Sequence, residues 1–263
     1  MLGKLLKYEI KAMGRVMLPL YAVMVFAACL FAFNLRLNMS GVAKFIVDRF
    51  AIVTGFLFGA AVLAVFVVMV IIVIQRFYKN LLGTEGYLMF TLPARTHEHI
   101  LSKAISSFLW ILIGGAAGFA AGFAMVGITS NIPAFIRQVQ EIWNELVPHH
   151  SAGPFIWFII LILAGIFESL IKVYAAIAVG HQFGSHRLAG SILAYIGFGI
   201  IEMAVSFIAN KLHLLPRNLF ALNAGGLESS VRAIQTGLLV VLLQMVIYGL
   251  LCWYLLDRKL NLE

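Results

Sequence analysis

Six long apolar stretches, separated by more polar connecting segments, dominate the pattern of the chain. A transmembrane helix needs roughly 20 predominantly apolar residues to cross about 30 Å of hydrocarbon, and each stretch is close to that length or longer. Each span must be helical, because lipid cannot hydrogen-bond an exposed backbone N–H or C=O group. The stretches are Val16–Phe33, Ile52–Ile74, Ala104–Ile128, Pro154–Gly180, Gly190–Ala209 and Gly237–Leu256. We therefore predict an all-α membrane protein with about six transmembrane helices, which form a single membrane domain over residues 1–263.

The residues before the first stretch have an amphipathic pattern. On a helical projection their basic side chains share one narrow sector, and apolar side chains lie opposite. The basic residues are Lys4, Lys7, Lys11 and Arg15. This pattern predicts an interfacial helix over Met1–Arg15 on the cytoplasmic surface of the membrane lipid, with a bend at Gly14 before the first span. The alternative is that the segment extends the first span into the cytoplasm.

Composition agrees with lipid as the main solvent. Apolar residues make up 62% of the chain and charged residues 11%, against about 45–50% and about 25% in a typical globular domain. The net charge of +8 does not indicate nucleic acid, because basic residues gather on the cytoplasmic side of membrane proteins. With both termini inside, eleven Lys and Arg residues fall in cytoplasmic segments and seven in outer segments. We expect a multi-pass plasma-membrane protein with both termini in the cytoplasm.

The two cysteines, Cys29 and Cys252, both lie within predicted spans. Cys29 is near the outer end of its helix and Cys252 near the inner end of its own. Their difference in depth exceeds the separation of about 7 Å that a disulfide can bridge. We expect two free, buried thiols.

The third stretch carries a glycine at every fourth position. The residues are Gly114, Gly118 and Gly122. Small residues at this spacing let helices approach closely in lipid, so we predict that they form a packing face.

Three ionisable residues fall inside predicted spans. Glu168 and Lys172 lie in the fourth stretch and Glu202 lies in the fifth. Such residues are costly in lipid and tend to face the bundle interior or a watery cavity. Glu168 and Lys172 have the spacing and order of a favourable i,i+4 ion pair, so a structural pair is one interpretation. The other places these residues along a substrate path, with Glu202 the better candidate because it has no basic neighbour in the sequence.

No catalytic signature occurs. His97-Glu98-His99 lacks the two-residue spacer that puts both histidines of a His-Glu-x-x-His zinc motif on one helix face. No Gly-x-x-x-x-Gly-Lys-Ser/Thr phosphate loop occurs either. We expect no enzyme activity and no cofactor in this chain, so that ATP and Mg²⁺, if they are used, bind to another subunit.

The segment 75–103, between the second and third stretches, is the most informative. It is basic at both ends, which places it in the cytoplasm. Pro93 excludes the α region for Leu92 and suits the first turn of a new helix. From Arg95 the pattern predicts a short polar helix that runs into the third span.

This segment resembles the first cytoplasmic loop of the permease subunits of type-2 ABC exporters. The resemblance rests on Glu85-Gly86-Tyr87-Leu88, Thr91-Leu92-Pro93-Ala94 and Lys103. It is closest to a subgroup common in Gram-positive bacteria. The chain differs from the family pattern in two places, because Arg95 comes one position early and Ser102 replaces the glycine before Lys103.

The resemblance implies a half-transporter. Two copies of such a subunit, identical or different, pair with two ABC ATPase subunits, and a cytoplasmic coupling helix in this loop docks in a cleft of each ATPase. The residues that the resemblance places in or near the coupling contact are Glu85, Gly86, Tyr87, Leu92, Pro93, Arg95 and Lys103. The implied cargo is an antimicrobial peptide, a drug or a lipid-like molecule, moved by alternating access. The alternative is a stand-alone six-helix transport or substrate-capture subunit, which would not need this loop.

Overall fold

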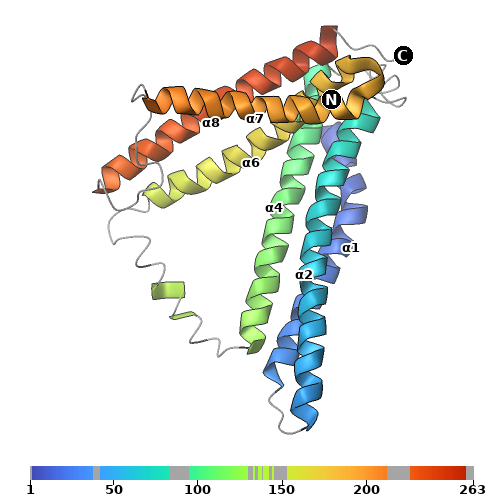
Figure 1. Cartoon of the computed structure of the whole chain (residues 1–263), viewed down its shortest axis with the longest axis vertical. Coiled ribbons are helices and arrows are strands. Elements are labelled where there is room, and N and C mark those ends of the chain that lie inside the picture. Colours follow the sequence, from blue (N-terminus) through green and yellow to red (C-terminus); the bar gives the residue numbers. More distant parts are fainter. Residues whose placement is uncertain are drawn as a thin grey trace. The chain divides into compact units, whose positions relative to one another are not determined.

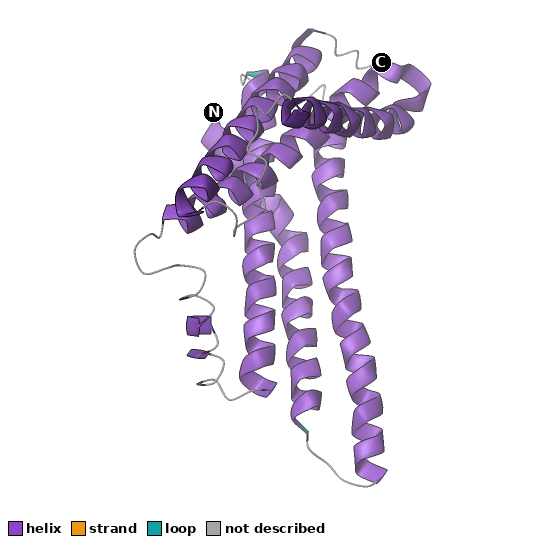
Figure 2. Ribbon diagram, turned by 60° about the vertical axis from the view of Figure 1, so that its left-hand side comes forward, coloured by secondary structure: helices purple, strands orange, loops and turns teal. Residues whose placement is uncertain are grey.

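The computed structural model describes residues 2–37, 42–82, 95–129, 153–211 and 226–258, with 133, 136, 137, 139–141 and 144. Within these residues every regular element is a helix (Figure 2). The main helices are α1 (Leu2–Arg36), α2 (Val42–Phe77), α4 (Thr96–Thr129), α6 (Gly153–Gly180), α7 (Arg187–Lys211) and α8 (Gly226–Arg258). A π-helical turn, η1 (Tyr78–Leu82), follows α2, and a 3₁₀ segment, η2 (His181–His186), joins α6 to α7.

The predicted set of six spans is confirmed. Among the described residues, six helices are long and apolar enough to cross a membrane. All six helices are longer than the apolar stretches that predict them. The candidate membrane-spanning segments within them are 22 to 35 residues long. At least about 20 residues are needed to cross the hydrocarbon core, so most of these helices extend beyond it.

The separate interfacial helix predicted over Met1–Arg15 is not confirmed. Helix α1 continues from Leu2 through Gly14 to Arg36. Gly14 serves packing instead of bending, because a Cβ at this position would lie 2.8 Å from the Trp110 ring. Trp110 also donates a hydrogen bond from Nε1 to the Ile10 carbonyl oxygen at 3.3 Å. The basic stripe is exposed on this helix, and Glu9, its one acidic interruption, is buried.

The chain packs as two compact units. One unit contains 3–73 and 105–145, and the other contains 74–104 and 146–263. Helices α2 and α4 contribute residues to both units, because one division point falls inside each of them, at 73/74 and at 104/105.

In the first unit, α1, α2 and α4 lie side by side (Figure 1). Tyr21 of α1 is buried and donates a hydrogen bond to the Trp110 carbonyl oxygen at 2.8 Å. A Cβ on Gly114 would lie 2.8 Å from the Tyr21 hydroxyl oxygen, so this glycine allows α1 and α4 to approach closely. A Cβ on Gly118 or Gly122 would meet no described residue of another helix within 4 Å. The predicted glycine face is therefore a packing contact inside the chain at Gly114 alone.

The second unit is built on α6, α7 and α8. Helices α6 and α7 approach so closely at their junction that a Cβ on Gly180 would lie 2.3 Å from the Ser191 backbone nitrogen. Gly184 makes the turn between them with a positive φ of 53°, a conformation that glycine adopts readily.

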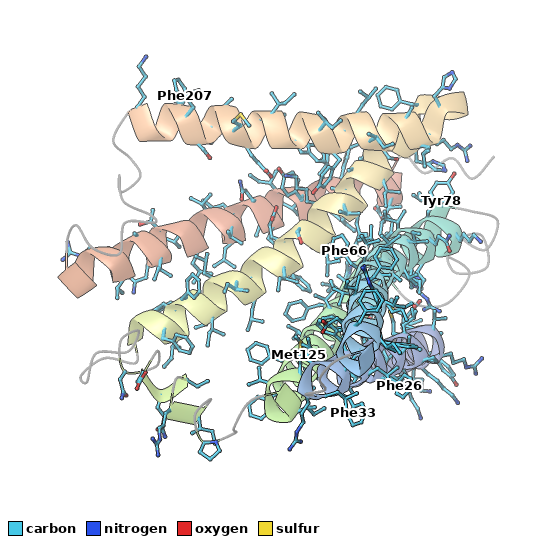
Figure 3. The ribbon with its side chains drawn as sticks, turned by 60° about the horizontal axis from the view of Figure 1, so that its bottom comes forward. Phe26, Phe33, Phe66, Tyr78, Met125 and Phe207 are labelled. Carbon is cyan, nitrogen blue, oxygen red and sulfur yellow. The ribbon has the colours of Figure 1, made fainter. Side chains whose placement is uncertain are left out.

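Large apolar side chains cover the outer faces of the spans. Phe26, Phe66 and Phe207 project from α1, α2 and α7 (Figure 3), and each is more than 60% exposed. A water-soluble protein of this size would bury many of these residues, whereas lipid solvates them. Cys29 and Cys252 are both free, as predicted. Cys252 is buried, and Cys29 is half-buried.

Candidate functional site

The coupling loop lies mainly outside the described residues. Of the positions that carry the resemblance, Glu85, Gly86, Tyr87, Leu92 and Pro93 fall in 83–94, which the structure does not describe. Arg95, Lys103 and both flanks of the loop are described.

Helix α4 begins where the sequence predicts. Arg95 stands immediately before the first helical residue, Thr96. The Glu98 carboxylate accepts a hydrogen bond from the Arg95 backbone N–H at 3.1 Å, and the Arg95 carbonyl oxygen accepts one from the Glu98 N–H at 2.9 Å. This is the carboxylate half of a capping box, which satisfies backbone groups that a helix N-terminus leaves free. The polar helix predicted from Arg95 into the third span is thus present.

The start of α4 is also tied to the end of α8. The Thr96 hydroxyl donates a hydrogen bond to Asp257 Oδ1 at 3.1 Å. Both residues belong to the second unit, and the contact joins positions 161 residues apart in the chain. The loop therefore enters α4 at a point held by α8.

Both flanks of the loop are buried against α6. The ring of Phe77, at the end of α2, stacks on the ring of Tyr174 with centroids 4.1 Å apart and planes 8° apart. On the other flank, the Tyr174 hydroxyl donates a hydrogen bond to the Lys103 carbonyl oxygen at 3.4 Å. Phe77, Lys103 and Tyr174 are each at most 2% exposed. We call Phe77, Lys103 and Tyr174 the loop anchor.

Lys103, which the resemblance places near the coupling contact, is buried in the structure. Its side chain is 2% exposed, so it does not present a free ammonium group to a docked subunit. Arg95, in contrast, is exposed at the mouth of the loop. Of the two described basic positions, Arg95 is the one available for a contact with a partner.

A second cluster of polar side chains lies inside the spans of α6, α7 and α8. Lys172 Nζ forms an ion pair with Glu202 Oε2 at 2.5 Å. Tyr248 donates a hydrogen bond to the other oxygen, Glu202 Oε1, at 2.5 Å. The Lys172 ammonium also lies 5.2 Å from the centroid of the Tyr195 ring, a cation–π distance. We call Glu168, Lys172, Tyr195, Glu202 and Tyr248 the intramembrane cluster.

The cluster is deep within its helices. Lys172, Glu202 and Tyr248 lie eight, nine and ten residues from the nearer ends of α6, α7 and α8. At a rise of 1.5 Å per residue, these positions are about 12–15 Å inside the helix ends. Ionised groups at such depth are stabilised by one another, because lipid does not solvate them.

The predicted i,i+4 pair between Glu168 and Lys172 is wrong. Lys172 pairs with Glu202 of the next helix, and no ion pair with Glu168 occurs in the part of the chain that the structure describes. Glu168 lies one helical turn before Lys172 on α6, and its Oε1 is buried without a hydrogen-bond partner among the described residues. Of the three predicted residues, Lys172 and Glu202 do come together, and Tyr195 and Tyr248 join them.

The tyrosines of both sites were not predicted from the sequence. Tyr174, Tyr195 and Tyr248 lie in apolar runs where a tyrosine is an ordinary packing residue. A buried phenol group needs a hydrogen-bond partner. A tyrosine inside a predicted span is therefore the one sequence signal that could have pointed to Tyr174 and Tyr248.

Comparisons with protein-family models, with curated proteins and with solved structures give no match.

Proposed function

We propose that this chain is the membrane-spanning permease subunit of an ABC exporter. The observation that carries the proposal is the loop of 83–94, whose residues resemble the coupling loop of such permeases and whose two flanks are held by one buried anchor. The six apolar spans supply the membrane part that this function needs.

The loop anchor gives a physical route for coupling. A soluble motor can move membrane helices only through an element that does not yield at the membrane surface. Phe77 and Lys103 sit at opposite flanks of the loop, and both contact the same buried side chain, Tyr174. Closure of an ATPase on the loop would therefore move α6 together with both flanks. Closely packed interiors transmit displacement in this way because they have few voids.

The proposal includes the partners. ATP and Mg²⁺ bind to a separate ABC ATPase subunit, and a second permease copy, identical or related, completes the transporter. The chain resides in a bacterial plasma membrane with both termini in the cytoplasm, and it has no catalytic role of its own. The cargo is a peptide, drug or lipid-like molecule, moved by alternating access.

A second candidate function is stand-alone transport or substrate capture. The observation that favours it is the intramembrane cluster, because buried ion pairs inside a bundle are also typical of secondary transporters. This candidate leaves the loop of 83–94 without a role. The two candidates differ in one requirement, which is a separate ATPase subunit.

We predict that replacing Tyr174 weakens coupling. In Tyr174→Leu the ring stack with Phe77 and the hydrogen bond to Lys103 are both lost, while apolar volume is largely kept. Changes along a coupling route alter coupling by about 0.5–2 kcal/mol, so cargo-stimulated ATP hydrolysis per assembled complex should fall roughly 2- to 30-fold. Hydrolysis is measured in proteoliposomes after size exclusion has isolated the intact complex.

Tyr174→Phe is the matched control, because it keeps the ring stack and removes only the hydroxyl group. Its activity should stay within about twofold of the unmodified protein, since the 3.4 Å hydrogen bond is long. Full stimulation in the assembled Tyr174→Leu complex would show that the anchor has no part in coupling.

A further inference from the structure

The intramembrane cluster contains more acceptors than its own donors satisfy. Both carboxylate oxygens of Glu202 receive a donor, one from Lys172 and one from Tyr248. Glu168 Oε1 is buried and receives no hydrogen bond from any described residue. The unmatched acceptor of the cluster is therefore an oxygen of Glu168.

An ionised carboxylate with an unmatched oxygen at this depth is stabilised most strongly by a positively charged donor. Burial removes the water that would otherwise solvate it, and the low dielectric of the surroundings strengthens its attraction for any cation that reaches it. Lys172 cannot serve both carboxylates equally, because its ammonium lies 2.5 Å from Glu202. The set contains no second ammonium group, so a cationic donor for Glu168 would come from outside it.

The chemistry of the cluster favours an organic cation over a metal ion. Hard metal ions take six or more oxygen ligands, whereas both oxygens of Glu202 are already engaged. The described residues contain no group of three or more His, Cys, Asp or Glu side chains that could hold a metal. In contrast, Lys172 demonstrates that these groups accommodate an ammonium, between a carboxylate and the Tyr195 ring.

We propose that Glu168 binds the ammonium or guanidinium group of the cargo, so that the transported molecules are cationic amphiphiles. The proposal rests on the export function above and narrows its cargo class. The apolar body of the cargo lies among the spans, and its charged head supplies the donor that Glu168 Oε1 lacks. The pair of Lys172 and Glu202 holds the neighbouring charges in place.

The test uses the purified full chain in lipid nanodiscs and a matched pair of fluorescent probes. The cationic probe is mono-dansylated 1,8-diaminooctane, and the neutral probe is the same molecule with its free amine acetylated. Binding is measured by fluorescence anisotropy, with empty nanodiscs as the reference for partition into lipid. The variant is Glu168→Gln, and the matched control is Asp48→Asn, which removes an exposed carboxylate from α2.

We expect the cationic probe to bind saturably to the unmodified chain and to the Asp48→Asn chain. Binding to Glu168→Gln should weaken by about tenfold or more, which corresponds to at least about 1.4 kcal/mol. The neutral probe should bind the unmodified chain and the Glu168→Gln chain equally weakly. Glu168→Asp, which keeps the charge, should retain saturable binding and serves as the informative variant if Glu168→Gln fails to fold.

Three results would overturn the cation site. Equal affinity of the cationic probe for the unmodified chain and Glu168→Gln would mean that Glu168 carries its own proton or has another structural role. Equal affinity of the two probes for the unmodified chain would indicate a purely apolar site. Absence of saturable binding would show that no such site exists. The titration needs no ATPase, so a failure of the export proposal and a failure of the cation site give different results.

Discussion

Tyr87→Asp and Pro93→Gly should each abolish export and the cargo-stimulated part of ATP hydrolysis. If the loop docks in the ATPase, a carboxylate at Tyr87 places an unpaired charge in an apolar contact, which is costly to bury. Pro93→Gly removes the fixed φ that favours a helix start and adds backbone freedom where a rigid element is needed. Export and hydrolysis are measured in proteoliposomes that contain the complete complex.

His97→Ala is the matched control for the loop variants. His97 is exposed in the first turn of α4, close to the loop in sequence but outside the residues that carry the resemblance. It should retain full activity. Size exclusion and membrane yield establish that each variant is folded. If Tyr87→Asp and Pro93→Gly both assemble and keep full stimulation, the loop does not couple hydrolysis to transport.

Lys172→Met should cause the largest loss of stability of any single change in the intramembrane cluster. It leaves Glu202 inside the spans without the ammonium that neutralises it. Removing one partner of a buried ion pair costs about 3–5 kcal/mol. For a chain of this size, that loss lowers the thermal midpoint by roughly 10 °C in detergent. The measurement is thermal unfolding of the purified chain.

Two further variants separate the ion pair from a general effect of mutation. The double variant Lys172→Met with Glu202→Gln should recover most of the lost stability, because the neutral amide still accepts the hydrogen bond from Tyr248 and no buried charge in the pair is left alone. Lys211→Met removes an exposed lysine from the end of α7 and should leave the midpoint unchanged. If the double variant is no more stable than Lys172→Met, the account of the pair is wrong.

The six spans were predictable because each depends on a local property. A run of about 20 apolar residues favours insertion into lipid, and in lipid it must be helical, independently of the rest of the chain. The N-cap region at Arg95 was predictable for the same reason, since Pro93 and the polar turn after it act on neighbouring residues only.

Contacts between distant residues were not predictable from the pattern. Gly14 looked like a bend, yet it accommodates the ring of Trp110, which is 96 residues further along the chain. Lys172 looked like a partner for Glu168 four residues away, yet Glu202 of α7 binds it. In both cases the local pattern allowed two outcomes, and packing between helices decided between them.

The division of the chain into two units was also hidden in the sequence. Two of its boundaries fall inside α2 and α4, where the helices continue without a break. The loop anchor makes the end of α2 and the start of α4 part of the α6–α8 unit, through side chains such as Phe77 and Tyr174. No pattern within either helix indicates which unit its end will join.

The most direct test of the proposed function is the composition of the complex that this chain forms. The tagged full chain is purified from its native membranes in a mild detergent, and the co-purifying chains are identified by peptide mass spectrometry. We predict a separate ATPase with a Gly-x-x-x-x-Gly-Lys-Ser/Thr phosphate loop, in about equal molar amount to this chain. Recovery of the folded chain without any ATPase, under conditions in which ABC ATPases stay folded, would contradict the account.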